Sequence, residues 1–371
     1  MSSFPLTRRH LLKRSALAAA APLLPLSAFA QERRFAPAPG AWRTFDLVTT
    51  VSVPEALGTT KLWLPLPDVE SDWQKPVENS WTGNATTVRI AADPARGVRM
   101  LYAEFAPTAG APTLTLTSRL QTRSRAIDWN ERRRVDEDPA LLRANLAPTL
   151  LLPTDGIVRK TALEATRGAR SDVDKARALY EWVIANAYRE PKTRGCGTGD
   201  IKAMLETGNL GGKCADLNAL FVGLCRSVGV PARDVYGLRL APSAFGYKEL
   251  GGNPAGLKGA QHCRAEVFLA GHGWVAMDPA DVLKVMRQET ADWIKDVKHP
   301  VAAPVHAGLF GRWEGNWVGW NSGHDIRLPG SAAKGTLPFL MYPNGENASG
   351  RFDEVAADSF RYTISAREIT A

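Results

Sequence analysis

Beyond its first thirty residues, the 371-residue sequence has no apolar run long enough to cross a membrane. It also has no dense basic segment, because the formal net charge of +8 falls to +8 − 4 = +4 without Arg8, Arg9, Lys13 and Arg14. A mild positive excess of that kind does not predict nucleic-acid binding. No phosphate-binding loop, EF-hand or cofactor motif is present. These absences predict a soluble globular protein that binds neither nucleic acid nor a cofactor.

Cysteine is scarce, with four residues in the chain, and no two of them form a CxxC pair. A structural zinc site is therefore not expected, and the histidines outside the motifs described below have no metal-ligand spacing. Cys214 and Cys225 lie on one predicted helix, about 16 Å apart along its axis, and so cannot form a disulfide. Whether Cys196, Cys225 and Cys263 form disulfides is left open by the sequence.

The first thirty residues have the pattern of a secretory signal peptide. A basic region is followed by an apolar stretch over 16–28 and a small-x-small site at Ala28-Phe29-Ala30, which predicts cleavage before Gln31. The run Thr7-Arg8-Arg9-His10-Leu11-Leu12-Lys13 resembles a twin-arginine export signal. We therefore expect a protein exported to the periplasm, with no membrane segment after cleavage.

The remaining chain divides into three predicted parts. Residues 31–130 contain short segments in which apolar and polar residues alternate, with Gly, Pro and Asn between them, and this predicts a β-sandwich domain. Residues 131–300 combine amphipathic helices near 155–167, 171–187 and 200–206 with later strands, and form the predicted catalytic core. Residues 301–371 contain Trp313, Trp317 and Trp320 and two further strands near 337–341 and 360–364. This part is expected to pack on the core as an extra β extension.

The stretch from Gly211 to Arg233 is the most informative part of the core. Gly-Gly-Lys precedes Cys214, and apolar residues then recur at three- and four-residue spacing up to Val228, before Gly229 and Pro231 end the helix. Cys214 is thus expected at a helix N-terminus, where free backbone N–H groups and the helix dipole favour a thiolate. This is a suitable position for a nucleophilic cysteine.

A β-hairpin is predicted further along the chain. The strand 261–269, a four-residue turn at 270–273 and the strand 274–279 bring His262 close to Asp278. A carboxylate that orients a histidine, which in turn activates a thiol, forms a Cys–His–Asp triad. The backbone N–H of Cys214 could help to hold the oxyanion.

Three motifs in order resemble the core of the transglutaminase-like superfamily over roughly residues 160–285. They are Gly-Gly-Lys-Cys-Ala-Asp with Gly-Val-Pro-Ala-Arg, then His-x-x-x-Glu-Val, then Gly-Trp-Val-x-x-Asp-Pro. The resemblance implies an α+β, papain-like fold, in which a helix bearing the cysteine packs on an antiparallel sheet bearing the histidine and aspartate. It also implies that Cys214 is the nucleophile, His262 the general base and Asp278 the orienting acid. Bacterial members commonly carry a preceding β-sandwich.

The resemblance implies an exported thiol enzyme acting on amide bonds of peptides or proteins, with cell-wall peptide among the candidate substrates. Hydrolysis is expected rather than cross-linking to an amine. A side chain for the oxyanion hole is not obvious from the motifs, and Asn209, five residues before Cys214, is the weak candidate, with a turn-forming role as the alternative. The alternative for the whole protein is a non-catalytic binding or scaffold role for a papain-like core.

Overall fold

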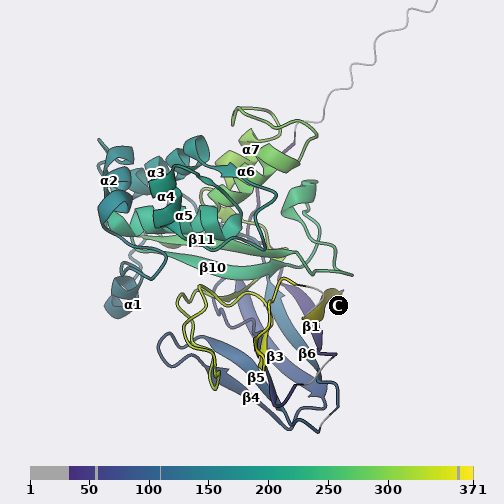
Figure 1. The fold of residues 1–371 in the computed structure, drawn as a ribbon. Helices are drawn as coiled ribbons and strands as arrows, with labels where there is room; N and C mark the ends of the chain where they lie inside the picture. The colour runs from purple at the N-terminus through teal and green to yellow at the C-terminus, as the bar shows by residue number, and fades with distance from the viewer. Residues whose placement is uncertain (1–32, 55–56, 109, 357–359, 371) are drawn as a thin grey trace, which may run out of the picture. The chain divides into compact units, whose positions relative to one another are not determined.

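The computed structural model describes residues 33–371 with the exception of 55–56, 109, 357–359 and 371 (Figure 1). The predicted signal peptide, its cleavage site and the twin-arginine run lie outside the described residues. Within the described part, no helix is both long and apolar enough to cross a membrane.

Two antiparallel sheets form the predicted β-sandwich. The four-stranded sheet has the order β17-β1-β6-β3 and the five-stranded sheet the order β16-β15-β2-β5-β4. Alternate residues of β1 and β6, such as Phe45, Leu47 and Leu116, share one apolar core with Leu62 and Leu64 of the other sheet. The strands are β1 (Arg43–Ser52), β2 (Thr60–Pro65), β3 (Gln74–Gly83), β4 (Thr87–Ala92), β5 (Arg99–Phe105), β6 (Thr113–Thr122), β15 (Asn344–Asn347), β16 (Gly350–Arg351) and β17 (Arg361–Ile369).

The central strands β2 and β5 of the five-stranded sheet are buried on both faces. Met100 and Tyr102 of β5 point away from the sandwich interior and form a second apolar cluster with Trp63 of β2. Ile326 and Leu340, from the chain after β14, complete this cluster. Alternate residues of β5 therefore face two different apolar clusters, because a segment distant in the sequence covers the outer face of the strand.

The predicted catalytic core contains a second antiparallel sheet with helices on it (Figure 1). Its strand order is β12-β11-β10-β14, and α5 packs against β10 and β11. This is the α+β, papain-like arrangement predicted from the sequence. The elements are β10 (Ala232–Arg239), β11 (Gln261–Leu269), β12 (Gly273–Met277), β14 (Trp317–Asn321), α1 (Pro139–Ala144), α2 (Gly156–Ala165), α3 (Asp172–Asn186), α4 (Ile201–Thr207), α5 (Cys214–Ser227), η1 (Lys248–Leu250), α6 (Pro279–Gln288) and α7 (Ala303–Gly308).

Local sequence signals set the helix boundaries. Ser171 caps α3 through a capping box with Asp174. Asp200 caps α4 by accepting a hydrogen bond from Ala203 N. Helix α5 begins at Cys214 as expected and ends before Gly229, whose φ of +84° is the left-handed conformation typical of a glycine after a helix.

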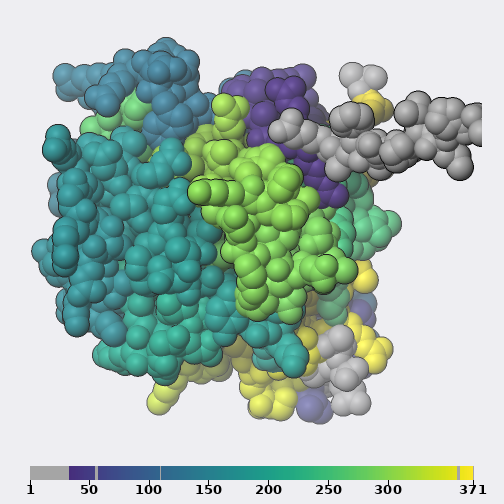
Figure 2. All heavy atoms as spheres, turned by 90° about the horizontal axis from the view of Figure 1, so that it is seen from above, coloured from purple at the N-terminus to yellow at the C-terminus, as the bar shows by residue number. Residues whose placement is uncertain are grey.

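The surface formed by these helices is seen in Figure 2, where the green segment around α7 lies beside the teal helices. The Tyr180 hydroxyl of α3 donates a hydrogen bond to the backbone oxygen of His306 in α7, at 2.9 Å.

The C-terminal residues join both sheet systems. Strand β14 pairs with β10 of the core, whereas β15 and β17 pair with β2 and β1 of the sandwich. The strand expected at 337–341 lies instead at 344–347, and only an isolated bridge from Leu337 to Ile326 is present in the expected range. Trp313, Trp317 and Trp320 are buried. Two short pairs complete the described strands, β7 (Arg125–Ala126) with β13 (Arg312–Trp313) and the parallel pair β8 (Tyr188–Arg189) with β9 (Gly211–Gly212).

Candidate active site

The position of Cys214 is set by the loop that precedes α4 and by the first turn of α5. The Asp216 carboxylate accepts hydrogen bonds from the backbone N–H groups of Thr198 and Gly199, both at 2.9 Å, and of Lys213, at 3.0 Å. The backbone N–H of Ala215 donates to the Cys196 oxygen at 3.0 Å. The backbone N–H of Cys214 has no acceptor among the described residues. It is therefore available to a developing oxyanion at the start of the helix.

Two glycines allow the backbone to lie close to the Asp216 side chain. A Cβ added to Gly197, whose φ is +92°, would lie 1.8 Å from Asp216 Oδ2. A Cβ added to Gly212 would lie 2.5 Å from Asp216 Cβ. Glycine is thus needed at both positions for steric reasons, because the carboxylate occupies the volume where their side chains would be.

His262 and Asp278 come together as the hairpin pattern predicts. His262 Nε2 and Asp278 Oδ2 are 2.7 Å apart, and both side chains are buried. The register differs from the expectation, since Leu269 pairs with Gly273 and the turn has three residues, 270–272, in place of four. Asp278 lies just beyond β12 as the N-cap of α6, and its Oδ1 accepts from the Asp281 backbone N–H at 3.1 Å.

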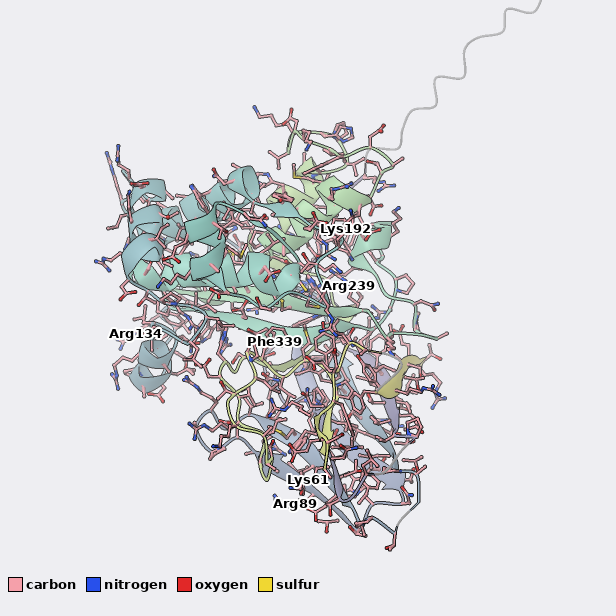
Figure 3. All side chains as sticks on the ribbon, in the orientation of Figure 1. Lys61, Arg89, Arg134, Lys192, Arg239 and Phe339 are labelled. Atoms are coloured by element: carbon pink, nitrogen blue, oxygen red, sulfur yellow. The ribbon has the colours of Figure 1, made fainter. Side chains whose placement is uncertain are left out.

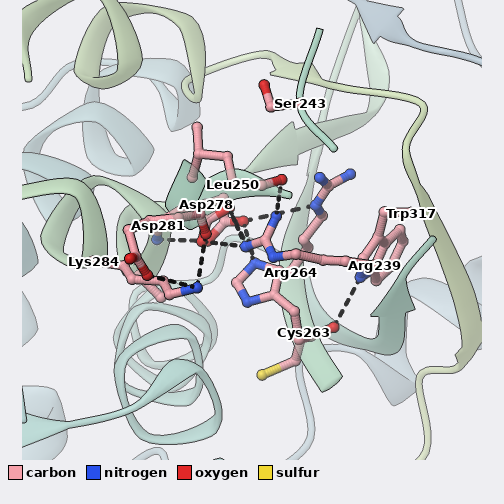
Figure 4. A network of polar contacts seen from close by, with 12 residues as sticks. Arg239, Ser243, Leu250, Cys263, Arg264, Asp278, Asp281, Lys284 and Trp317 are labelled. Carbon is pink, nitrogen blue, oxygen red and sulfur yellow. Dashed lines mark hydrogen bonds and ion pairs between the residues drawn. The ribbon is translucent and has the colours of Figure 1, made fainter. Parts of the chain in front are cut away.

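A second carboxylate contacts the same histidine. Asp281 Oδ2 lies 3.3 Å from His262 Nε2, and Arg239 Nη2 pairs with both oxygens of Asp281 at 2.5 and 2.8 Å (Figure 4). Figure 3 shows Arg239 inside the molecule, in contrast to Arg134 at its edge. Sequence reasoning missed Asp281 and Arg239. The available signal was the Asp-x-x-Asp spacing at the start of α6, which places two carboxylates in the first helical turn.

Neighbouring side chains fix the histidine backbone and the first carboxylate. Trp317 Nε1–H donates to the His262 backbone oxygen at 2.9 Å. Asn218 Nδ2 donates to Asp278 Oδ1 at 3.2 Å and to the Cys263 backbone oxygen at 2.8 Å, which links α5 to β11. Arg264 lies over the Trp317 ring at 4.7 Å, with its Nε 3.7 Å from Asp278 Oδ2. The carboxylate therefore has hydrogen bonds or charge partners on both oxygens.

The electrostatics favour a thiolate–imidazolium pair. Hydrogen bonds from Cys196 and Cys263, together with the His262 ring, hold the pKa of the Cys214 thiol well below its usual value against the opposing effect of burial. Burial and the Arg239 charge lower the pKa of His262, but the Asp281 and Asp278 carboxylates outweigh them and raise this pKa to about 9. Both shifts favour the charged forms of the two groups.

Three of the four cysteines gather at this point. Cys196 and Cys263 are both within hydrogen-bonding reach of Cys214, and all four cysteines are unpaired and buried. The hydrogen bond to Cys214 and burial raise the pKa of Cys196 well above its usual value. Cys263 is a buried thiol, as are all residues of β11.

His262, Asp278 and Asp281 could in principle ligate a metal ion, because their ligand atoms lie within 4.8 Å of one another. The guanidinium groups of Arg239 and Arg264 already face the two carboxylates. A divalent cation would have to displace or approach these fixed positive charges, so the donor set fits an imidazolium better than a metal.

Asn209 does not lie at this site. It is exposed, and its Oδ1 accepts from the Tyr188 hydroxyl at 3.0 Å and from the Gly211 backbone N–H at 3.2 Å. The predicted oxyanion role is therefore not supported by its position. Asn209 forms a turn between α4 and β9, and the five-residue spacing to Cys214 was misleading because that turn directs the side chain to the surface.

Cys214 and His262 line a cavity of about 300 Å³. One wall comes from the glycine-rich segment 251–260, which also contains the buried Leu257. The remaining lining residues are Arg189, Gly195, Cys196, Lys213, Arg239, Gln261 and Lys284.

Comparison with known proteins agrees with this geometry. A family model described as the transglutaminase-like superfamily matches residues 159–279. The chain is 31% identical over 343 residues to an uncharacterised protein of Haemophilus influenzae, covering 88% of this chain and 90% of that one.

Among solved structures, a candidate cysteine protease from Cytophaga hutchinsonii matches with a TM-score of 0.50 and 16% identity, over 88% of this chain and 99% of that one. This match concerns the fold. The periplasmic domain of TgpA from Pseudomonas aeruginosa matches with a TM-score of 0.34 and 18% identity, over 66% of this chain and 91% of that one.

The family match ends at residue 279, so it includes the cysteine, the histidine and Asp278. The arrangement of helix α5 on the sheet that bears His262 is the papain-like one. The chain belongs to the transglutaminase-like superfamily.

Proposed function

We propose that the protein is an exported thiol enzyme that cleaves amide bonds of peptides or proteins through an acyl-enzyme. The observation that carries the proposal is the His262–Asp278 contact of 2.7 Å beside a thiol whose pKa is held low, in a cavity that both His262 and Cys214 line. A nucleophile, an oriented base and a free backbone N–H are the parts that acyl transfer requires.

The reaction follows from these positions. The Cys214 thiolate attacks the amide carbonyl carbon, and the Cys214 backbone N–H stabilises the oxyanion. The C–N bond then breaks while the His262 imidazolium gives its proton to the departing amine, leaving a thioester. Neutral His262 takes a proton from water, which attacks the thioester, and the thiolate leaves with the acid as product. Asp278 keeps the imidazole oriented throughout.

Hydrolysis fits the cavity better than transfer to an amine. Five cationic side chains line the cavity, and no carboxylate is among its lining residues in the described part. A protonated lysine approaching the thioester would meet repulsion from these charges, whereas water would not. Export to the periplasm is proposed from the predicted signal peptide, and peptide or protein, including cell-wall peptide, is the proposed substrate.

The decisive experiment is the rate of iodoacetamide alkylation against pH, with the modified residue identified by mass spectrometry. In the mature protein, Cys214 should react rapidly at pH values well below the normal thiol pKa of about 8.5. This fast phase should be lost in His262→Ala. Cys225→Ala is the matched control, since Cys225 lies on the same helix but outside the site, and it should leave the profile unchanged. Slow labelling of Cys214 that does not depend on His262 would refute the proposal and favour a binding or scaffold role.

A further inference from the structure

The cavity beside Cys214 has a marked charge imbalance. Its lining includes Arg189, Lys213, Arg239, Lys258 and Lys284, and none of its described lining residues is acidic. The negative charge of the Cys214 thiolate is compensated by the His262 imidazolium, so it does not neutralise these five cations. Only some of the five have a carboxylate partner elsewhere in the protein.

Two of the cations are neutralised by their own partners. Arg239 is buried and pairs with both oxygens of Asp281. Lys284 Nζ lies 3.3 Å from Glu249 Oε2 and donates to the Glu249 backbone oxygen at 2.7 Å. The carboxylates of Asp281 and Glu249 neutralise these two cations, so the two side chains should attract an anionic ligand only weakly.

The other three have no carboxylate partner within the described residues. Arg189 donates through Nε to Gln288 Oε1 at 2.9 Å, and its two terminal nitrogens have no acceptor there. Lys258 is exposed and lies over the Tyr362 ring, at 4.8 Å, and its Nζ forms no ion pair in the described part. Lys213, directly before Cys214, is half-buried, and its Nζ likewise forms no ion pair there. Three unpaired cations in one cavity cost free energy through mutual repulsion, and a bound anion would relieve that cost.

We propose that this cavity selects acidic peptides, with Arg189, Lys213 and Lys258 binding carboxylates close to the scissile amide. The inference rests on the proposed function and names its substrate class. The three cations come from separate elements, β8, the residue before α5 and the glycine-rich segment. Such a distribution suits several carboxylates spaced along a peptide better than one compact phosphate, and Arg189 can bind a carboxylate through two nitrogens.

Two alkylating reagents of similar size test the charge without knowledge of the substrate. Iodoacetate is an anion and iodoacetamide is neutral, so the ratio of their rates at Cys214, divided by the same ratio for glutathione, reports the cavity potential. We expect a normalised ratio of about ten or more at about 20 mM salt, decreasing strongly at about 500 mM salt. A normalised ratio near one with fast iodoacetamide labelling would overturn the selectivity proposal alone. Slow labelling by both reagents would overturn the proposed function and the selectivity with it.

Single variants assign the effect to residues. Arg189→Gln, Lys213→Gln and Lys258→Gln should each reduce the normalised ratio by about two- to fivefold, and any change in the reactivity of the thiolate itself cancels in this ratio. The matched control is Lys202→Gln, because Lys202 lies on α4 outside the cavity and pairs with Glu206. An equal reduction in the control variant would mean that the net charge of the protein, and not the cavity, determines the ratio.

Protection experiments identify the anion. Acetyl-Glu-Ala-Glu-amide, acetyl-Gln-Ala-Gln-amide and inorganic phosphate are each added before iodoacetamide. The proposal expects the acidic peptide to slow Cys214 alkylation at a concentration at least about tenfold below that of the neutral peptide. Stronger protection by phosphate than by the acidic peptide would overturn the assignment to carboxylates, and equal protection by the two peptides would overturn charge selection.

Discussion

Asp281 Oδ2 lies 3.3 Å from His262 Nε2, so two carboxylates three residues apart flank one imidazole nitrogen. The two acids have different environments. Burial opposes ionisation of Asp281, but Arg239 and His262 hold its pKa well below the usual range. Burial and the neighbouring Asp281 charge instead raise the pKa of Asp278. Asp281 is thus a permanent anion behind the histidine, whereas Asp278 supplies the shorter hydrogen bond.

This relationship predicts the effect of Asp281→Asn on the pH profile. The variant should lower the pKa of His262 from about 9, because one of the two carboxylates that raise it is removed. The alkaline limit of peptide cleavage should move to lower pH by about one unit or more. The pH dependence of kcat measures this shift. A large loss of activity with an unchanged alkaline limit would mean that Asp281 has only a structural role.

The same variant leaves Arg239 buried without its partner, which should destabilise the fold by about 3 kcal/mol or more. The double variant Asp281→Asn with Arg239→Met should recover part of this loss, because the unpaired charge is also removed. Urea unfolding of both variants separates the stability effect from the pKa effect.

The raised histidine pKa also predicts how stability changes with pH. The pKa of His262 rises from 6.5 to about 9 on folding, so the imidazolium contributes stability that is fully present below pH 6.5 and is lost as pH rises through about 9. The contribution is of order 3 kcal/mol. In His262→Gln, the decrease in unfolding free energy between pH 6 and 9.5 should be smaller than in the wild type. A parallel decrease in both proteins would contradict the linkage.

Removing the Cys196 thiol should change the pKa of Cys214. Hydrogen bonding from Cys196 is the leading cause of the low pKa of Cys214, so Cys196→Ala should raise this pKa and shift the alkylation midpoint to higher pH. Cys225→Ala removes an equally buried thiol with no contact to Cys214 and serves as the control. The prediction is wrong if both variants have the wild-type midpoint.

Gly197, in the loop before α4, should tolerate no side chain, because it lies against the Asp216 carboxylate. Gly197→Ala should destabilise the protein by at least about 2 kcal/mol and slow Cys214 alkylation, because the new Cβ overlaps the carboxylate that holds the loop. Gly208→Ala is the control. Gly208 also has a positive φ, +70°, but open space around it, so its cost should be limited to about 1 kcal/mol of backbone strain. Thermal unfolding measures both, and equal losses would mean that strain alone explains the result.

Asn209→Ala should change kcat by less than about twofold, because Asn209 lies on the surface and its side chain serves the turn before β9. An oxyanion donor would instead cost about a hundredfold or more. The kcat for cleavage of a peptide substrate by the variant and the wild type distinguishes the two roles. A large loss of kcat at unchanged stability would restore the role that the sequence suggested.

Several parts of the fold and site were predictable from local patterns. The start of α5 at Cys214, the cap at Ser171 and the hairpin that brings His262 to Asp278 depend on residues close in sequence. Two errors were local, namely the length of the hairpin turn and the position of Asn209. Other features could not be predicted because the contacts are distant in sequence. The outer face of β5 is covered by residues after β14, and the C-terminal strands complete sheets that begin near residue 43.

The sequence alone predicted the residues of the proposed triad, because a glycine turn, a helix start and a hairpin are local and each needs particular residue types. Only the tertiary structure decided what surrounds them. The neighbouring groups come from elements far apart in the chain. They are Asp281 with Arg239, the Cys196 and Cys263 thiols, and the three unpaired cations of the cavity. Electrostatic interactions depend on distance in space and on burial, and the sequence specifies neither until the sheets and helices have packed.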